Sequence, residues 1–378
     1  MNAQFQTLLG GLRTRIFSTL ALMILLVGCD SPTAGITTIT ELDVAYPNAD
    51  QVPPAQWGST HEIIQGENAL WLTSPNHDAV VKVDLDGQMS FYPLPTDSAP
   101  HGIAFDAAGQ LWVSLEAQGT IVQLDEKGTI ITAYDVHLAC ANCAEAINPH
   151  PHGLGIGSDG RTIWYTGKGT GTVGKITPDG EITSYTLPTV GSVPIYVKAG
   201  HDGNMWVTEL VGNKIARVTV DGEVTEFAIP THNSRPIAIV PEPGGQAMWF
   251  TEEASSKVGR IAMDGTITEW SVPKTQDNVI LAGLAFDDAK NLWVQQYVDP
   301  NQPTPTGADH IIKIDRAILT ASPSDLSGIP ISFYQVPTAE TGMHRIILGL
   351  NGTLWFTELR TNKVGKITTN LLSLDTTP

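Results

Sequence analysis

Histidines that open short apolar segments, and glutamates that close the segments after them, are the side chains of this sequence best suited to do chemistry. The clearest case is PHGIAFDAAGQLWVSLE (100–116), which runs from His101 near its start to Glu116 at its end. Two apolar runs joined by a small polar turn predict a β-hairpin. With a turn at 107–110, counting outward pairs His101 with Glu116, whose Cβ atoms would lie about 4.5–5.5 Å apart. A neutral imidazole can remove a proton, and a carboxylate beside it can orient the ring or bind a metal ion.

The same two residue types recur at corresponding places in other segments. Histidines also open segments at His61, His152 and His344. Further glutamates close segments at Glu209, Glu252 and Glu358, whereas Gly167 and Gln296 take this place elsewhere. Such residues can also be purely structural, because a histidine can cap backbone groups and a glutamate can bond to the neighbouring segment. The structural interpretation is favoured for Glu209 and Glu252, which lack a histidine partner.

A second candidate site lies in HLACANCAEAINPHPHG (137–153). Cys140, Cys143, His150 and His152 could form a metal cluster, although His-x-His is not the usual zinc spacing. In an oxidising compartment, Cys140 and Cys143 would instead close a small disulfide loop, which is the favoured prediction. A dithiol redox site is the remaining alternative.

Seven tryptophans mark an internal repeat that must position these residues: Trp71, Trp112, Trp164, Trp206, Trp249, Trp293 and Trp355. Their spacings are 41, 52, 42, 43, 44 and 62 residues, and the two long gaps coincide with insertions. Four strand signals in each repeat of about 42 residues are typical of a propeller blade. We therefore predict an all-β protein, a seven-bladed β-propeller with four antiparallel strands per blade, in one domain.

Such a ring gathers the histidines on one side of its central channel. The first strand of each blade lines the channel, so its start and the end of the second strand lie at the same mouth. His61, His101, His152 and His344 belong to repeats one, two, three and seven, which are consecutive around a closed ring. Packing does not demand this asymmetry, so the sequence predicts a functional site at this mouth.

The N-terminal segment has the layout of an export signal. Arg13 and Arg15 precede an apolar run that ends in LLVGC (25–29). This ending resembles the lipobox of bacterial lipoproteins, in which Cys29 becomes the lipidated first residue. The sequence thus predicts a signal peptide over 1–28, a flexible tether over 29–56, the propeller over 57–370 and a C-terminal tail over 371–378. The protein would be an exported, membrane-anchored lipoprotein facing the periplasm or the cell exterior.

Charge limits the partners. The 21 Lys+Arg against 39 Asp+Glu give a net charge of −18. Without residues 1–28, which hold two arginines and no acids, the balance is 19 against 39, or −20. Such a surface repels phosphate backbones, so we expect no nucleic-acid partner. The charge suits a cationic ligand or a metal ion, and we expect a monomer.

The repeats resemble the virginiamycin B lyase (streptogramin lyase) family over about residues 57–370. The phrases LWFTE…NKVGKIT, DGEVTEFAIPT and PHGIAFD carry the resemblance. It implies a seven-bladed propeller that opens cyclic streptogramin antibiotics by elimination at an ester. It also implies a histidine base in a PHGI-type strand and Mg²⁺ held by nearby glutamates.

The resemblance assigns roles to the mouth residues. His101 with Glu116 matches the family motif best, and a second histidine corresponds to His61. The family has an acid two residues before the base, where this chain has Ala99. If the family motif is instead matched by its position in the last blade, it falls at His344 and Glu358, where MHRI replaces PHGI. The predicted site thus comprises catalytic His101, His61 and His344, metal ligands Glu116 and Glu358, and His152 as a substrate contact.

Three functions remain open on these grounds. The favoured one is a metal-dependent carbon–oxygen lyase acting on a small-molecule or cyclic peptide ligand. The second is a non-catalytic exported propeller that binds a ligand or a protein. The third is a lactonase-like hydrolase, whose inward Glu/Asn/Asp metal cage cannot be assembled from this sequence.

Overall fold

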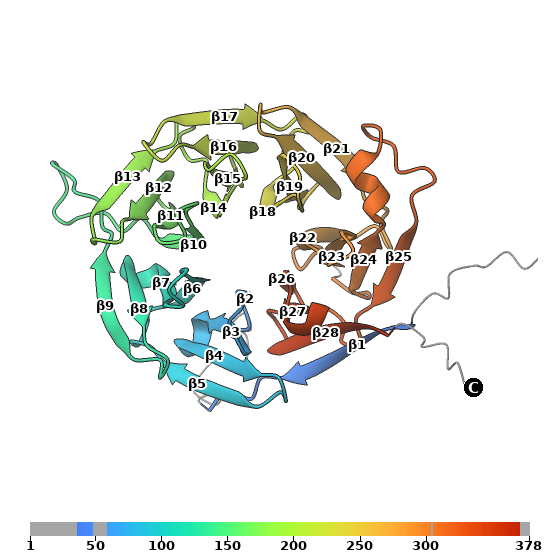
Figure 1. The fold of residues 1–378 in the computed structure, drawn as a ribbon, viewed down its shortest axis with the longest axis horizontal. Helices are drawn as coiled ribbons and strands as arrows, with labels where there is room; N and C mark the ends of the chain where they lie inside the picture. Colours follow the sequence, from blue (N-terminus) through green and yellow to red (C-terminus); the bar gives the residue numbers. More distant parts are fainter. Residues whose placement is uncertain (1–35, 48–58, 304, 371–378) are drawn as a thin grey trace, which may run out of the picture. The chain divides into compact units, whose positions relative to one another are not determined.

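The computed structural model describes residues 36–47, 59–303 and 305–370, and these form seven four-stranded antiparallel sheets arranged as a ring (Figure 1). The predicted seven-bladed propeller is confirmed. From the innermost strand outward, the first four blades are β2 (Ile63–Gln65), β3 (Ala69–Ser74), β4 (Ala79–Asp84) and β5 (Met89–Pro93); β6 (Pro100–Phe105), β7 (Leu111–Leu115), β8 (Thr120–Leu124) and β9 (Ile130–Asp135); β10 (Pro151–Ile156), β11 (Ile163–Gly167), β12 (Thr172–Ile176) and β13 (Ile182–Thr186); and β14 (Pro194–Ala199), β15 (Met205–Glu209), β16 (Lys214–Val218) and β17 (Val224–Ala228). The other three are β18 (Pro236–Pro241), β19 (Ala247–Glu252), β20 (Lys257–Ala262) and β21 (Ile267–Ser271); β22 (Val279–Phe286), β23 (Leu292–Val298), β24 (His310–Ile314) and β25 (Ile331–Gln335); and β26 (Met343–Leu348), β27 (Leu354–Glu358), β28 (Lys363–Asn370) and β1 (Ile36–Asp43).

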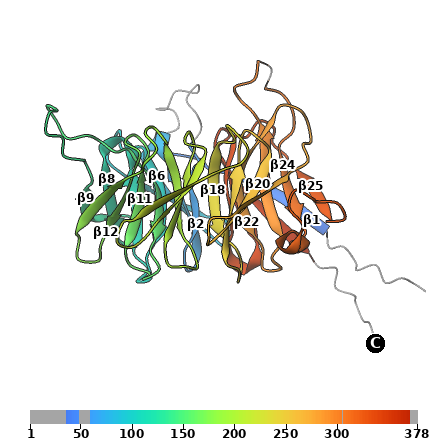
Figure 2. The same cartoon turned by 90° about the horizontal axis from the view of Figure 1, so that it is seen from above.

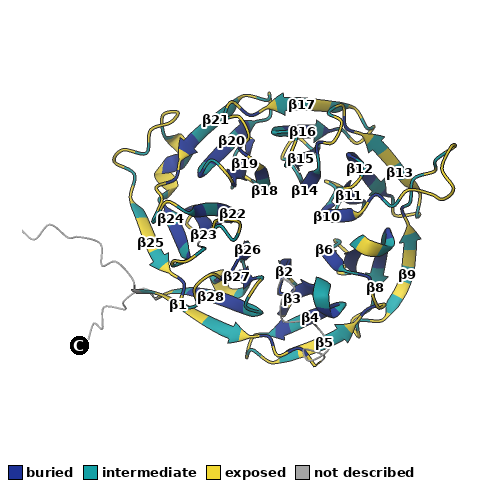
Figure 3. Cartoon of the chain, turned by 180° about the vertical axis from the view of Figure 1, so that it is seen from behind, coloured by how far each residue is buried: buried dark blue, intermediate teal, exposed yellow. Residues whose placement is uncertain are grey.

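The repeated tryptophan organises each blade. In six blades it stacks on an aromatic ring of the fourth strand, as Trp206 does on Phe227 with centroids 5.8 Å apart. In blades three to five, the Asp-Gly turn packs against the fourth-strand ring of the preceding blade. At Gly265, where φ is +92°, a Cβ atom would lie 2.0 Å from the Phe227 ring, so this turn requires glycine. Buried residues gather on the inner strands and exposed residues on the outer ones (Figure 3).

Part of the segment predicted to be a flexible tether is a strand of the seventh blade. Residues 36–43, assigned from the sequence to a flexible segment over 29–56, form β1, the outermost strand beside β28. The Glu41 carboxylate accepts hydrogen bonds from the Thr338 N–H at 2.8 Å and from its hydroxyl at 2.6 Å. The N-terminal strand therefore closes the ring. The predicted signal peptide, Cys29 and the C-terminal tail lie outside the described residues.

A belt of side-chain hydrogen bonds joins consecutive blades. The residue two positions after each repeat tryptophan is Ser or Thr in six blades and Gln295 in the sixth blade. Its oxygen accepts from an N–H of the innermost strand in its own blade, as Ser114 does from Gly102 at 2.7 Å. Its hydroxyl or amide donates to a carbonyl of the innermost strand in the next blade, as Ser114 does to His152 at 3.1 Å. We call this array the hydroxyl belt.

Insertions in two blades flank the predicted mouth. The insertion at 137–150 lies between β9 and β10 and leads into a first strand, and the segment between β23 and β24, described at 299–303 and 305–309, leaves a second strand. Both therefore lie at the face where the first strands begin, and Figure 2 shows loops rising from that face of the ring. No helix among the described residues is long and apolar enough to cross a membrane.

Buried glutamates end the second strands of blades four, five and seven. Glu209, Glu252 and Glu358 are each 0% exposed. Each lies beside a glutamate of the fourth strand. That second glutamate binds two groups: the lysine that begins the third strand, and a threonine in the loop that precedes a first strand, as Glu226 binds Lys214 and Thr189. Burial, and next the charge of Glu226, raises the pKa of Glu209 to about 8. Blade six has Gln296 at this position, and its side-chain oxygen accepts two bonds from Thr275 without a charge.

Glu209→Gln is expected to flatten the pH dependence of stability. Because the pKa is about 8 in the folded protein and near 4.5 in the unfolded one, the folded state holds an extra proton between these values. That stabilisation is complete below pH 4.5 and is lost as the pH rises through 8. The variant should match the wild type at pH 4.5 and exceed it at pH 8, with a slope changed by at most about 1.4 kcal/mol per pH unit. Denaturant titrations across this range, with exposed Glu223→Gln as the control, measure it; parallel curves for wild type and Glu209→Gln would contradict it.

Candidate functional site

Four histidines lie side by side at the channel mouth where the first strands begin. His101, His152 and His344 are in β6, β10 and β26, and His61 lies two residues before β2. The ring centroids are 3.8 Å apart for His344 and His61, 4.0 Å for His61 and His101, and 3.5 Å for His101 and His152. The structure thus brings together all four histidines that the sequence placed here, in the order of their blades. We call them the histidine row.

Close packing of the inner strands makes this spacing possible. Gly102 and Gly153 follow their histidines in β6 and β10. A Cβ atom at Gly102 would lie 2.3 Å from the His152 carbonyl oxygen, and one at Gly153 would lie 2.5 Å from the Ile195 carbonyl oxygen. Only glycine permits that approach. The hydroxyl belt also holds the carbonyls of His61, His101 and His152 from the preceding blade.

The histidine row is neutral. Burial lowers the pKa of His61, His101, His152 and His344 well below the usual range. Neighbouring cationic groups add to the effect; Arg345 lowers the pKa of His344, and Lys168 lowers that of His152. A neutral imidazole is the form that accepts a proton or binds a metal ion.

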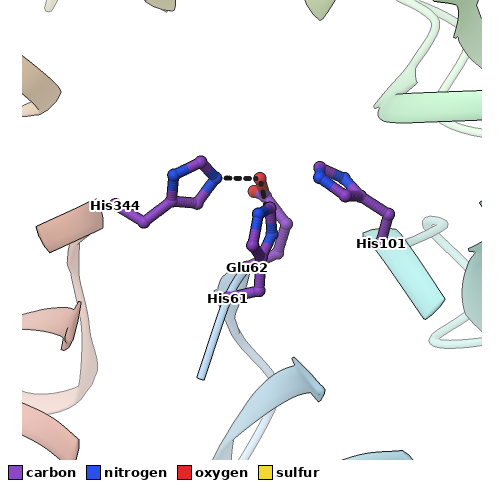
Figure 4. Close-up of side chains that lie close together, drawn as sticks. All are labelled: His61, Glu62, His101 and His344. Carbon is purple, nitrogen blue, oxygen red and sulfur yellow. Dashed lines mark ion pairs between the residues drawn. The ribbon is translucent and has the colours of Figure 1, made fainter. Parts of the chain in front are cut away.

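A buried ion pair that was not predicted from the sequence lies beside the histidine row. Glu62 and Arg345, each 3% exposed, directly follow His61 and His344. Arg345 Nε donates to Glu62 Oε2 at 3.0 Å, and its Nη2 lies 2.9 Å from Oε1. The guanidinium also lies over the Tyr196 ring, 4.4 Å from the centroid. Glu62 lies between the His344 and His101 rings (Figure 4). Its Oε1 is 3.3 Å from His344 Nε2.

His152 has a fixed tautomer. Its Nδ1 lies 3.1 Å from the Ile195 carbonyl oxygen, which can only accept a hydrogen bond. Nδ1 therefore carries the proton, and Nε2 keeps the lone pair. Lys168 lies in the same part of the mouth and forms an ion pair with Glu116 at 2.5 Å. Lys168 is a site residue that the sequence does not predict.

The predicted cross-strand pair His101–Glu116 is wrong. Pro100 lies opposite Leu115 and Phe105 opposite Leu111, with a register shift between Pro100 and Ile103. The shift arises where Gly102 N–H bonds the Ser114 hydroxyl in place of a backbone carbonyl. Glu116 lies beyond the strand, in the 3-10 helix η3 (Glu116–Gln118). It still comes close to His101 and His152, since ligand atoms of these three residues lie within 4.8 Å of one another.

The described residues contain two groups that could hold a metal ion. One is His61, Glu62, His101 and His344, and the other is His101, Glu116 and His152. Neither includes Glu358, whose Oε2 accepts from Thr361 at 2.8 Å in the network described above. Mg²⁺ prefers six oxygen ligands, whereas each group offers one carboxylate among imidazoles. The donor sets therefore do not fit the Mg²⁺ that the family resemblance implies.

Other candidate residues lie apart from the row. Cys140 and Cys143 form a disulfide in the exposed 137–150 insertion, and neither joins a metal group among the described residues. His150 is exposed, and its backbone N–H donates to the Asn148 side-chain oxygen. A cleft of about 560 Å³ opens at the opposite ends of the strands of blades one and two, beside Trp71 and Phe105. It contains no histidine.

Comparisons with known proteins agree with this architecture. Residues 143–302 match the model of the virginiamycin B lyase family. Virginiamycin B lyase of Nocardia farcinica (strain IFM 10152) is 31% identical over 159 residues, 42% of this chain, and the match spans about half (51%) of that protein. The structure of selenomethionine-substituted virginiamycin B lyase from Staphylococcus aureus is 28% identical, with a TM-score of 0.70 over 89% of this chain and 100% of that one. A catalytically inactive histidine-to-alanine variant of the Staphylococcus aureus enzyme with quinupristin is 27% identical, with a TM-score of 0.71 over 89% and 100% of the two chains. These similarities confirm the resemblance seen in the sequence: the chain is a virginiamycin B lyase-like β-propeller.

Proposed function

We propose that the channel mouth is the active site of a lyase that opens an ester of a cyclic peptide by elimination. The observation that carries the proposal is the row of four histidines beside Lys168. It is supported by the similarity to lyases around the whole ring, including one that loses activity when a histidine is replaced. His152 and Lys168 also lie within the segment that matches the family model.

His152 is the proposed base. Its Nε2 lone pair would take the proton from a carbon that lies next to one carbonyl and one bond from the carbon bearing the ester oxygen. The C–H electrons form a C=C bond, the carbon–oxygen bond breaks, and the ester leaves as a carboxylate. No water enters the products. The Lys168 ammonium would hydrogen-bond the carbonyl on which negative charge develops, and Glu116 would position the ammonium.

His101, the base predicted from the sequence, takes a supporting place in this scheme. It lies between His61 and His152, so its ring fixes the orientation of both neighbours.

His152→Ala is expected to lower kcat for a streptogramin B substrate such as quinupristin by about 10²–10⁴, since it removes the general base. Lys168→Met should lower kcat by about 10²–10³. Exposed His232→Ala and Lys274→Met serve as matched controls. Mass spectrometry of the product checks the reaction type: a linear product with the mass of the substrate supports elimination, and a gain of one water supports the lactonase-like hydrolase.

Two results would redirect the proposal. Loss of turnover in His101→Ala but not in His152→Ala would return the base to His101. Saturable binding of the cyclic peptide without any product would support the non-catalytic binding propeller. The proposals that the protein is exported and lipid-anchored through Cys29 are tested separately, by mass spectrometry of the mature N-terminus.

A further inference from the structure

Four buried polar atoms that meet around Glu62 have no hydrogen-bond partner. They are His61 Nδ1, His101 Nδ1, His344 Nε2 and Glu62 Oε1. Oε1 contacts Arg345 Nη2 and His344 Nε2 as ion pairs only, without hydrogen-bond geometry. Buried polar atoms in folded proteins nearly always have partners, so four orphans in one place indicate a missing ligand.

The positions of these residues fit a metal ion. One ligand atom from each of His61, Glu62, His101 and His344 lies within 4.8 Å of the others. The side chains come from three consecutive blades and point toward one centre (Figure 4). A tetrahedral ion with bonds of about 2.0–2.2 Å would draw such donors to about 3.4 Å apart, a small adjustment of side-chain torsions.

We propose that His61, His101, His344 and Glu62 bind a divalent transition-metal ion, with Zn²⁺ the best fit. Three imidazole nitrogens and one carboxylate oxygen are the donors that zinc takes in four-coordinate sites. Mg²⁺ keeps oxygen ligands and water, so this site selects against it. The site therefore departs from the ion implied by the family resemblance.

Arg345 has a defined place in this arrangement. Its Nε holds Glu62 Oε2 at 3.0 Å, and Oε1, which lies 2.9 Å from Nη2, also faces His344 Nε2 at 3.3 Å. The guanidinium also balances the carboxylate charge, so the imidazoles supply most of the affinity. This second contact orients a ligand in the way that outer partners orient ligands of other zinc sites.

The site is tested on the full chain, stripped of metal by a chelator and titrated with ZnCl₂ or MgCl₂ alone. We expect one Zn²⁺ per chain with a Kd below about 1 μM and Mg²⁺ binding at least 1,000-fold weaker. Excess Zn²⁺ at about 100 times the Kd should raise Tm by about 5 °C. His61→Ala/His344→Ala should lose at least 100-fold in zinc affinity, whereas the surface control His137→Ala/His232→Ala should keep it. No zinc binding by the wild type, or equal binding by the cluster variant, overturns the proposal.

A second measurement needs no variant and covers the case in which the cluster variant fails to fold. X-ray absorption of the zinc-loaded wild type should show nitrogen and oxygen neighbours with the scattering pattern of three imidazoles. A shell without imidazole overturns the site.

The inference does not depend on the proposed lyase reaction. Zinc bound at this site without peptide turnover supports the metal site and contradicts the lyase. Turnover by a chain that binds no zinc when titrated with ZnCl₂ overturns the metal site and leaves the lyase standing.

Discussion

Replacing strand β1 (Ile36–Asp43) by a glycine–serine segment of the same length is expected to lower Tm by about 10 °C. The strand supplies the fourth member of blade seven, and without it β28 becomes an open edge. The loss includes both Glu41 bonds to Thr338 and the contact of Lys363 with Asp43 at 2.7 Å. Together these amount to several kcal/mol, which at about 2 °C per kcal/mol gives the stated shift.

The control keeps the strand and changes only its exposed face. Thr38→Ser/Thr40→Ser alters two exposed side chains of β1 and should change the free energy of unfolding by less than about 0.5 kcal/mol. Thermal unfolding followed by circular dichroism compares the variants. An unchanged Tm after replacement of the whole strand would show that the three remaining strands of blade seven suffice.

Arg345→Met is expected to lower the free energy of unfolding by about 3–5 kcal/mol. It leaves the Glu62 carboxylate buried at 3% exposure without its guanidinium partner. Glu62→Gln/Arg345→Met removes both charges and should recover most of the loss, to within about 1 kcal/mol of the wild type. The recovery separates the cost of an unpaired buried charge from the cost of lost packing against Tyr196.

An exposed ion pair provides the matched comparison. Arg235 Nε lies 2.7 Å from Glu253 Oε2, but the arginine side chain is 48% exposed. Arg235→Met should therefore cost less than about 1 kcal/mol. Denaturant titrations of the four proteins at one pH give the required free energies. A double variant no more stable than Arg345→Met would place the effect in packing rather than in charge.

The seven blades could be predicted because the signals are local: a tryptophan in every blade, a hydroxyl two residues later in six, a fourth-strand aromatic residue in six and an Asp-Gly turn before the fourth strand in four. β1 could not be found by counting forward from Trp71, because it pairs with a strand more than 300 residues away in the chain. A signal was nevertheless present: TITEL (38–42) repeats the TITEW (266–270) of a fourth strand. An alignment of the fourth-strand sequences alone shows that Glu41 is equivalent to Glu269 and Glu226.

The histidine row could be predicted from blade order, but its chemistry could not. The turn between β6 and β7 spans 106–110 instead of 107–110, and Gly102 then bonds a side chain; alternation of apolar residues reveals neither change. Glu62 and Arg345 replace the glycine that follows His101 and His152, so opposite charges occupy this position in two adjacent blades. These two charged residues in place of glycine are the sequence signal that indicates the ion pair. Lys168 lies in a turn, where spacing rules do not indicate which way a side chain points.

The hydroxyl belt determines which segments of the chain must be exchanged together to transfer a functional histidine. Each first-strand histidine of blades one to three is held by a hydroxyl from the blade before it, as His152 is by Ser114. A graft of one sequence repeat would carry a histidine without the group that anchors its carbonyl. The transferable module is offset by half a blade: the second strand of one blade together with the first strand of the next. Chimeras joined in the turns between first and second strands should thus transfer a functional histidine together with the hydroxyl that holds its carbonyl. Chimeras joined between blades should separate the two.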